Sequence, residues 1–149
     1  MDTTYRAPGV MHPPPLVDAP ARDAAALLGR ALLAALFIWS GFGKLVGFAA
    51  TTGYIASKGM PLASVLAALA VLVELGGGIL LLIGLKARWV ALAFALFLVV
   101  ITPIFHAWWS SPPAEVGMQQ INFVKNVAIL GGMLMVWAFG PGRYSIDRG

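Results

Sequence analysis

Glu74 is the residue in this sequence most able to do chemistry, because it lies near the middle of a long apolar stretch. A charged side chain near the centre of a bilayer costs about 2.5 to 3.5 kcal/mol on insertion scales, so it needs a compensating partner. The residues on its own helical face are small: Ala67, Ala70, Gly77 and Gly78. Small residues let another helix approach closely. We therefore expect Glu74 to point into a helical bundle and away from lipid.

Two basic residues are candidate partners for the Glu74 carboxylate. Counted at about 1.5 Å per residue along the predicted helices, Lys125 lies at nearly the same depth, within reach of a lysine stem. Lys125 is therefore the preferred partner. Arg30 lies closer to one membrane face but can reach toward the same carboxylate, which would complete a network of three charges. In the simplest interpretation these charges form a structural ion pair that fixes the helix register, without any ligand.

The alternative interpretation is a polar cavity that binds a ligand or handles protons. The predicted lining residues are Lys44, Glu74, His106, Asn122 and Lys125, with Trp39 and Trp109 nearby. Ionisable residues inside a membrane are functional candidates by default. An imidazole such as that of His106 is able to hydrogen-bond a quinone carbonyl or to move a proton near neutral pH. A histidine that only hydrogen-bonds a neighbour fits the sequence equally well.

Four apolar segments must position these residues, and they predict an all-α membrane protein, a four-helix transmembrane bundle. Of the 149 residues, 60% are hydrophobic and 11% are charged, too few charges to cover the surface of a soluble domain. The predicted spans are residues 24–43, 61–85, 89–105 and 119–139. Each is close to the length that crosses about 30 Å of hydrocarbon. Together they form one predicted domain, residues 24–142.

A polar tail is predicted on each side of this domain. Residues 1–23 are rich in proline and poor in large apolar side chains, which predicts a disordered tail, and residues 143–149 form a second, shorter one. Basic residues gather on the membrane side that carries both termini: Arg6, Arg22, Lys86, Arg88, Arg143 and Arg148. Because positively charged segments stay inside, both termini are predicted to be cytoplasmic, in the inner membrane of a bacterium.

Several classes of function are excluded by the composition. The chain has no cysteine, which excludes disulfides, iron–sulfur clusters and thiol chemistry. The second histidine, His12, lies in the predicted tail, so a bis-histidine haem site is excluded. The sequence also lacks the cluster of carboxylates and histidines that a diiron or copper centre requires. The basic residues that give the net charge of +4 are spread singly, which argues against nucleic-acid binding. We expect no covalent or metal cofactor, and a quinone is one candidate ligand.

A series of short motifs resembles the DoxX family of small bacterial integral membrane proteins. The motifs, in chain order, are residues 38–45, 59–61, 74–78, 83–85 and 88, then 106, 125–126, 131–132 and 140–147. The resemblance covers residues 27–147. It implies a four-helix inner-membrane protein with a link to respiratory or sulfur-related redox systems, because the family takes its name from a subunit of a terminal quinol oxidase.

Three functions remain open at this stage. The first is a quinone-interacting or accessory subunit of a respiratory or redox complex, not catalytic alone, whose electrons pass through a partner chain. The second is a structural or assembly subunit that binds other membrane proteins through its small-residue faces. The third is a small-solute carrier with Glu74 as a proton-coupled site, which would need a dimer. The expected partners are therefore the lipid bilayer and other membrane subunits or a homo-oligomer, and no nucleic acid.

Overall fold

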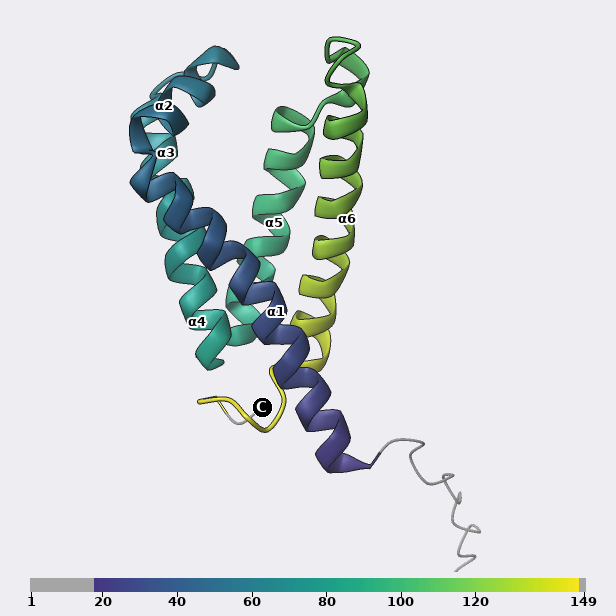
Figure 1. Ribbon diagram of the computed structural model, residues 1–149. Helices are drawn as coiled ribbons and strands as arrows, with labels where there is room; N and C mark the ends of the chain where they lie inside the picture. The colour runs from purple at the N-terminus through teal and green to yellow at the C-terminus, as the bar shows by residue number, and fades with distance from the viewer. Residues whose placement is uncertain (1–17, 148–149) are drawn as a thin grey trace, which may run out of the picture.

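The computed structural model describes residues 18–147, and all regular elements among them are helices (Figure 1). Four helical segments are long and apolar enough to cross a membrane: Ala19–Val46, Ala63–Ile83, Ala87–Ser110 and Val116–Phe139. The prediction of an all-α, four-span protein is confirmed. The first and last described residues lie at the same end of the bundle (Figure 1), which we call the terminal end. The opposite end is called the distal end.

The first span, α1 (Ala19–Val46), is longer than the apolar segment that predicted it. Asp18 caps its first turn, because the carboxylate accepts a hydrogen bond from the backbone N–H of Ala21 at 3.0 Å. The helix therefore includes residues 19–23, which the sequence placed in a disordered tail. Residues 1–17 of that predicted tail lie outside the described residues.

A short helix, α2 (Phe48–Ser57), follows α1 at the distal end, where the sequence predicted only a connecting segment (Figure 1). The two helices are separated at Gly47. α2 packs against α3 (Ala63–Val71). Ile55 is its buried residue and Thr51, one turn earlier, lies on the same face, so α2 presents one face to the bundle.

The second span is interrupted by a wider helical turn around Glu74. α3 continues directly into a π-helical turn, η1 (Leu72–Gly76), which leads into α4 (Gly77–Ile83). Such turns are rare and occur frequently at functional sites. Gly84, with a φ of 72°, ends α4 in the left-handed conformation that glycine adopts without strain.

The last two spans pack against each other along their length. α5 (Ala87–Phe105) is joined to α6 (Val116–Phe139) through a short 3-10 turn, η2 (Trp108–Ser110). Between them Asn126 donates to the hydroxyl of Thr102 at 3.2 Å, so this buried amide is satisfied.

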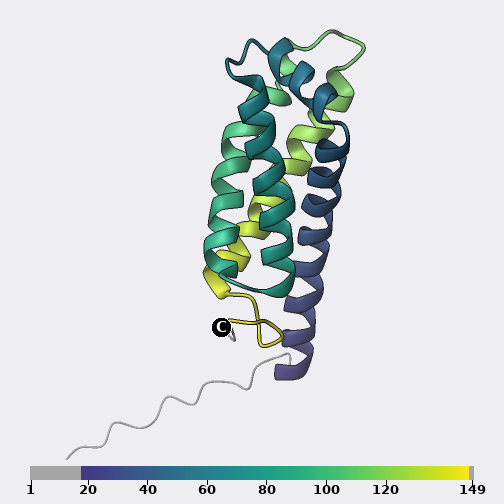
Figure 2. The same cartoon turned by 90° about the vertical axis from the view of Figure 1, so that its left-hand side faces the viewer.

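The core occupies the terminal half of the bundle, and the distal half is open. Phe37 of α1 stacks on Phe94 of α5 with ring centroids 3.9 Å apart, surrounded by small and aliphatic side chains. Beyond this level α1 leans toward α3 and away from α6, while α5 stays beside α6 (Figure 1); Figure 2 views the bundle from the side of α3 and α4. The distal half holds a cavity lined by residues of α1, α2, α3, η1 and α5.

Candidate functional site

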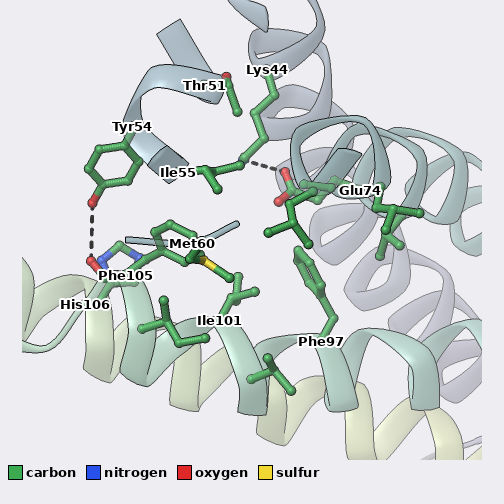
Figure 3. Close-up of a pocket in the computed structure, with 16 residues that line it drawn as sticks. Lys44, Thr51, Tyr54, Ile55, Met60, Glu74, Phe97, Ile101, Phe105 and His106 are labelled. Carbon is green, nitrogen blue, oxygen red and sulfur yellow. Dashed lines mark hydrogen bonds and ion pairs between the residues drawn. The ribbon is translucent and has the colours of Figure 1, made fainter. Parts of the chain in front are cut away.

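Lys44 and Glu74 form the one ion pair found among residues 18–147, with 2.7 Å between Nζ and Oε2 (Figure 3). The side chain of Glu74 is 4% exposed and that of Lys44 is 31% exposed. Glu74 therefore points into the bundle, as its small neighbours predicted. One of these neighbours, Gly78, permits the approach of α1, because a Cβ there would lie 3.1 Å from the backbone nitrogen of Ile38.

Gly41 brings α1 and η1 close enough to form the pair. A Cβ at Gly41 would lie 2.5 Å from the backbone nitrogen of Leu75 and 3.0 Å from the Cβ of Glu74, closer than real Cβ atoms approach backbone. Lys44 follows Gly41 by about one helical turn and lies on the same face of α1. The glycine contact therefore sets the position of the lysine relative to the carboxylate.

Lys44 keeps one hydrogen-bond donor free for a ligand. Besides Glu74, its Nζ donates to the hydroxyl of Ser40 at 2.7 Å. An ammonium group has three N–H donors, and these two bonds use two of them. Within residues 18–147 the third donor has no partner, and the side chain lines a cavity. The site can thus offer a charged donor to an oxygen acceptor.

The cavity has a volume of about 400 Å³ and lies between α2 and α3 on one side and α5 on the other (Figure 3). Its apolar wall is made by Ile55, Met60, Leu66, Leu69, Ala70, Val73, Phe97, Val100, Ile101, Ile104 and Phe105. Its polar groups are Lys44, Thr51, Tyr54, Glu74 and His106. A mostly apolar wall with a few convergent polar groups is typical of small-molecule sites.

His106 lies at the distal side of this cavity and is held by α6. Its Nδ1 is 2.9 Å from Oε1 of Gln119. Because an amide oxygen only accepts hydrogen bonds, Nδ1 carries the proton in this arrangement and Nε2 is left as an acceptor. Nearby, the hydroxyl of Tyr54 donates to the carbonyl of Phe105 at 3.4 Å. The cavity therefore has a donor at Lys44 and an acceptor at His106.

The predicted pairing of Lys125 with Glu74 is wrong. Lys125 is exposed, and its Nζ donates to Oδ1 of Asn122 on the same helix at 2.9 Å. The physical reason is the packing of α6, which lies along α5 and has no extended contact with η1. Equal depth along two helices does not make those helices neighbours. Neither Lys125 nor Asn122 lines the cavity beside the ion pair.

Both tryptophans that were expected near the cavity lie elsewhere. Trp39 is 82% exposed on α1. Trp109 packs edge-on against Phe123, with ring centroids 5.7 Å apart, on the side of α5 and α6 away from the ion pair. The structure thus brings together Lys44, Glu74 and His106 from the predicted cavity residues, and it adds the side chains of α2.

Arg30 also lies apart from Glu74, so the expected network of three charges is absent. Its guanidinium is buried at the terminal end and donates to the carbonyl oxygen of Pro141, to that of Tyr144 at 2.5 Å and to that of Leu82 at 3.4 Å. Carbonyl oxygens, and not a carboxylate, therefore accept hydrogen bonds from the two terminal nitrogens of this buried cation, while its Nε has no partner among residues 18–147.

The carbonyl partners of Arg30 belong mainly to residues 140–147, which we call the C-terminal clasp. The backbone N–H groups of Ile146 and Asp147 donate to the carbonyls of Ile83 and Gly84, both at 3.2 Å. The carboxylate of Asp147 accepts from the backbone N–H of Ala87 at 3.2 Å. The clasp thus closes the terminal end of the bundle over the turn between α4 and α5.

The family model of DoxX matches residues 25–107, which contain α2, η1, α5 and the whole Lys44–Glu74 site. The chain belongs to the DoxX family. This DoxX-family protein is 37% identical over 126 residues to inner membrane protein YqjF of Escherichia coli K12, a match of 85% of the chain and 92% of the relative. It is 37% identical over 128 residues to inner membrane protein YphA of the same organism, 86% of the chain and 91% of the relative.

More distant matches are shorter. A Surfeit locus protein 4 homolog of Drosophila melanogaster is 28% identical over 72 residues, which is 47% of this chain and 27% of that protein. No solved structure matches the DoxX-family protein significantly. The four apolar helices and the two full-length inner-membrane relatives show that the chain is a multi-pass inner membrane protein.

Sequence reasoning missed the contribution of α2 and of Gln119 to the site of this DoxX-family protein. The segment of α2 contains no proline and carries Thr51 and Ile55 one helical turn apart, a pattern that could have indicated a helix with one buried face. Gln119 carries no comparable signal, because its role depends on how α5 and α6 place the two side chains.

Proposed function

We propose that this DoxX-family protein is a non-catalytic subunit of an inner-membrane redox complex and that its distal cavity binds a quinone. The observation that carries the proposal is the combination of an apolar cavity of about 400 Å³ with the free donor of Lys44. A quinone headgroup is a flat ring whose carbonyl oxygens accept hydrogen bonds. The ammonium of Lys44, held by Glu74 and Ser40, supports the binding of such an oxygen.

The lipid-facing side of the cavity supports the same ligand class. Leu69 and Val100 line the cavity and are 50% and 58% exposed, so the cavity communicates with the hydrocarbon around the protein. A quinone can enter from the bilayer and leave its apolar tail among the lipids. His106 is suited to accept a proton from the reduced form through Nε2. Electrons pass through a partner chain in this proposal.

The quinone proposal is tested with decylubiquinone and the purified protein in lipid nanodiscs. A ligand that binds the folded state raises the melting temperature in a concentration-dependent way. We expect decylubiquinone to raise it, and decanol, which has the chain without the headgroup, to do so far less. Val100→Trp places a bulky ring in the cavity and is expected to weaken binding at least tenfold.

Val99→Trp is the matched control for this experiment. Val99 is 56% exposed, against 58% for Val100, but it lines a separate groove on the other side of α5. The control should bind decylubiquinone as the unaltered protein does. Equal binding by both variants, or equal effects of decylubiquinone and decanol, would show that the cavity does not bind a quinone.

We also propose that both termini are cytoplasmic, which places the cavity in the periplasmic half of the membrane. The exposed basic side chains of Arg22, Lys86, Arg88 and Arg143 belong to the terminal end, in agreement with the positive-inside rule. A phosphatase reporter that is active only in the periplasm should be inactive when fused after Arg148 and active when inserted at Ser111. The opposite result would reverse the orientation and move the cavity to the cytoplasmic half.

A further inference from the structure

Lys125 is an exposed cation in the middle of a membrane-spanning helix. It lies in the first half of α6 (Val116–Phe139), about 14 Å from the distal end of that helix at 1.5 Å per residue. Among residues 18–147 its Nζ has only Asn122 as a partner, and no acidic side chain in that range pairs with it. A lysine at this depth without an anion carries a large insertion cost.

The position of Lys125 shows which side of the bundle is left uncovered. Gly132 lies two helical turns away on the same side of α6, and a Cβ there would lie 3.3 Å from the side chain of Leu33 in α1. At the level of Gly132, α1 therefore covers this side. Toward the distal end α1 leans toward α3 and away from α6 (Figure 1), and Lys125 is exposed. Asn122 and Lys125 thus form an uncovered polar face of α6, which we call the α6 face.

Lipid headgroups and a second copy of this chain do not suit the α6 face. A lysine stem reaches about 6 Å, well short of the headgroups beyond the end of the helix. A second copy in the same orientation would offer Lys125 no free carboxylate at this depth among residues 18–147. The one acidic residue within its spans near that depth is Glu74, which is 3% exposed and already bonded to Lys44.

We propose that the α6 face docks a transmembrane helix of another membrane protein that carries an aspartate or glutamate at the depth of Lys125. A carboxylate there would form an interhelical ion pair, and the amide of Asn122 would hydrogen-bond the same group. Such a pair fixes both the depth and the rotation of the incoming helix. The inference goes beyond quinone binding and does not depend on it, because the α6 face is separate from the cavity.

The test is a zero-length cross-link in native membranes. Dicyclohexylcarbodiimide enters the bilayer, activates carboxyl groups and joins them to an amine in direct contact. We expect mass spectrometry to find Lys125 joined to an aspartate or glutamate within a membrane span of a different protein. We also expect mild detergent to extract an assembly larger than the chain alone.

Two lysine variants and one cavity variant make the result decisive. Lys125→Gln should lose the cross-link and at least nine-tenths of the larger assembly, whereas Lys58→Gln, an exposed lysine beyond α2, should lose neither. Val100→Trp should keep the cross-link even though it fills the cavity. A cross-link only to a second copy, a Lys125→Gln variant with an unchanged assembly, or the loss of only a bound phospholipid in that variant would each overturn the proposal.

Discussion

Lys44→Met is expected to destabilise the protein more than Glu74→Gln, although both variants break the same ion pair. Lys44→Met leaves the carboxylate of Glu74, 4% exposed, without a cation. Removal of one partner of a buried pair costs on the order of 3 to 5 kcal/mol. Glu74→Gln leaves Lys44, which is 31% exposed and keeps its bond to Ser40, so the cost should be closer to about 1 to 2 kcal/mol. Thermal melting in nanodiscs measures both.

The double variant Lys44→Met with Glu74→Gln separates the pair from other effects. Because it leaves no unpaired charge, we expect it to be more stable than Lys44→Met alone. Simple addition of the two single effects would mean that the residues do not interact. Melting temperatures equal to that of the unaltered protein in all three variants would show that the pair contributes nothing to stability.

A change in helix spacing should break the same pair without altering a charge. Gly41→Ala places a methyl group 2.5 Å from the backbone nitrogen of Leu75, so α1 must move away from η1. Forced packing of this kind costs about 1 to 3 kcal/mol. Gly43→Ala is the matched control, because nothing lies within 4 Å of a Cβ there. We expect Gly41→Ala to melt lower and Gly43→Ala to melt at or above the unaltered protein.

Arg30→Met is the second substitution for which we expect a large effect. It removes the donors to the carbonyls of Pro141, Tyr144 and Leu82, and each charge-assisted hydrogen bond is worth about 1.5 to 3 kcal/mol. The C-terminal clasp should come loose, so trypsin should cut after Arg143 much faster in inverted membrane vesicles. Inverted vesicles are used because the terminal end is proposed to face the cytoplasm, and inversion exposes that side to trypsin.

Arg30→Lys should rescue this defect only in part. A lysine offers a compact charge and cannot reach carbonyls that a planar guanidinium reaches with its separate N–H groups. Arg22→Met is the control, since Arg22 is exposed on the same helix and its side chain makes no hydrogen bond in the described structure. Full rescue by lysine would mean that the charge alone holds the clasp.

The sequence predicted the features that depend on neighbouring residues along the chain. Apolar length indicated the four spans, and the small residues around Glu74 indicated its buried face, because helical periodicity places residues three and four apart on one side. The second span, predicted to end at residue 85, ends at Ile83, and Gly84 follows it with a positive φ.

The partners of the charged residues could not be predicted in this way. Lys44 was expected at the end of the first span among the cavity-lining residues, but not as the partner of Glu74. α1 continues to Val46 and places the lysine 2.7 Å from the carboxylate. Lys125 lies close to the depth of Glu74, but its helix, α6, packs along α5 and has no extended contact with η1. Arg30 is satisfied by a chain segment that folds back, which no local pattern reveals. Each outcome depends on helix tilt or on distant parts of the chain.

The C-terminal clasp has a consequence for the order in which the protein is made. Arg30 bonds to the carbonyls of Pro141 and Tyr144, which lie 111 and 114 residues later in the chain. The ribosome has therefore delivered all four spans before this arginine can reach these two acceptors. Until then the carbonyl of Leu82 is the one acceptor of the three that has been synthesised. The terminal end of the bundle closes only when residues 140–147 have left the ribosome.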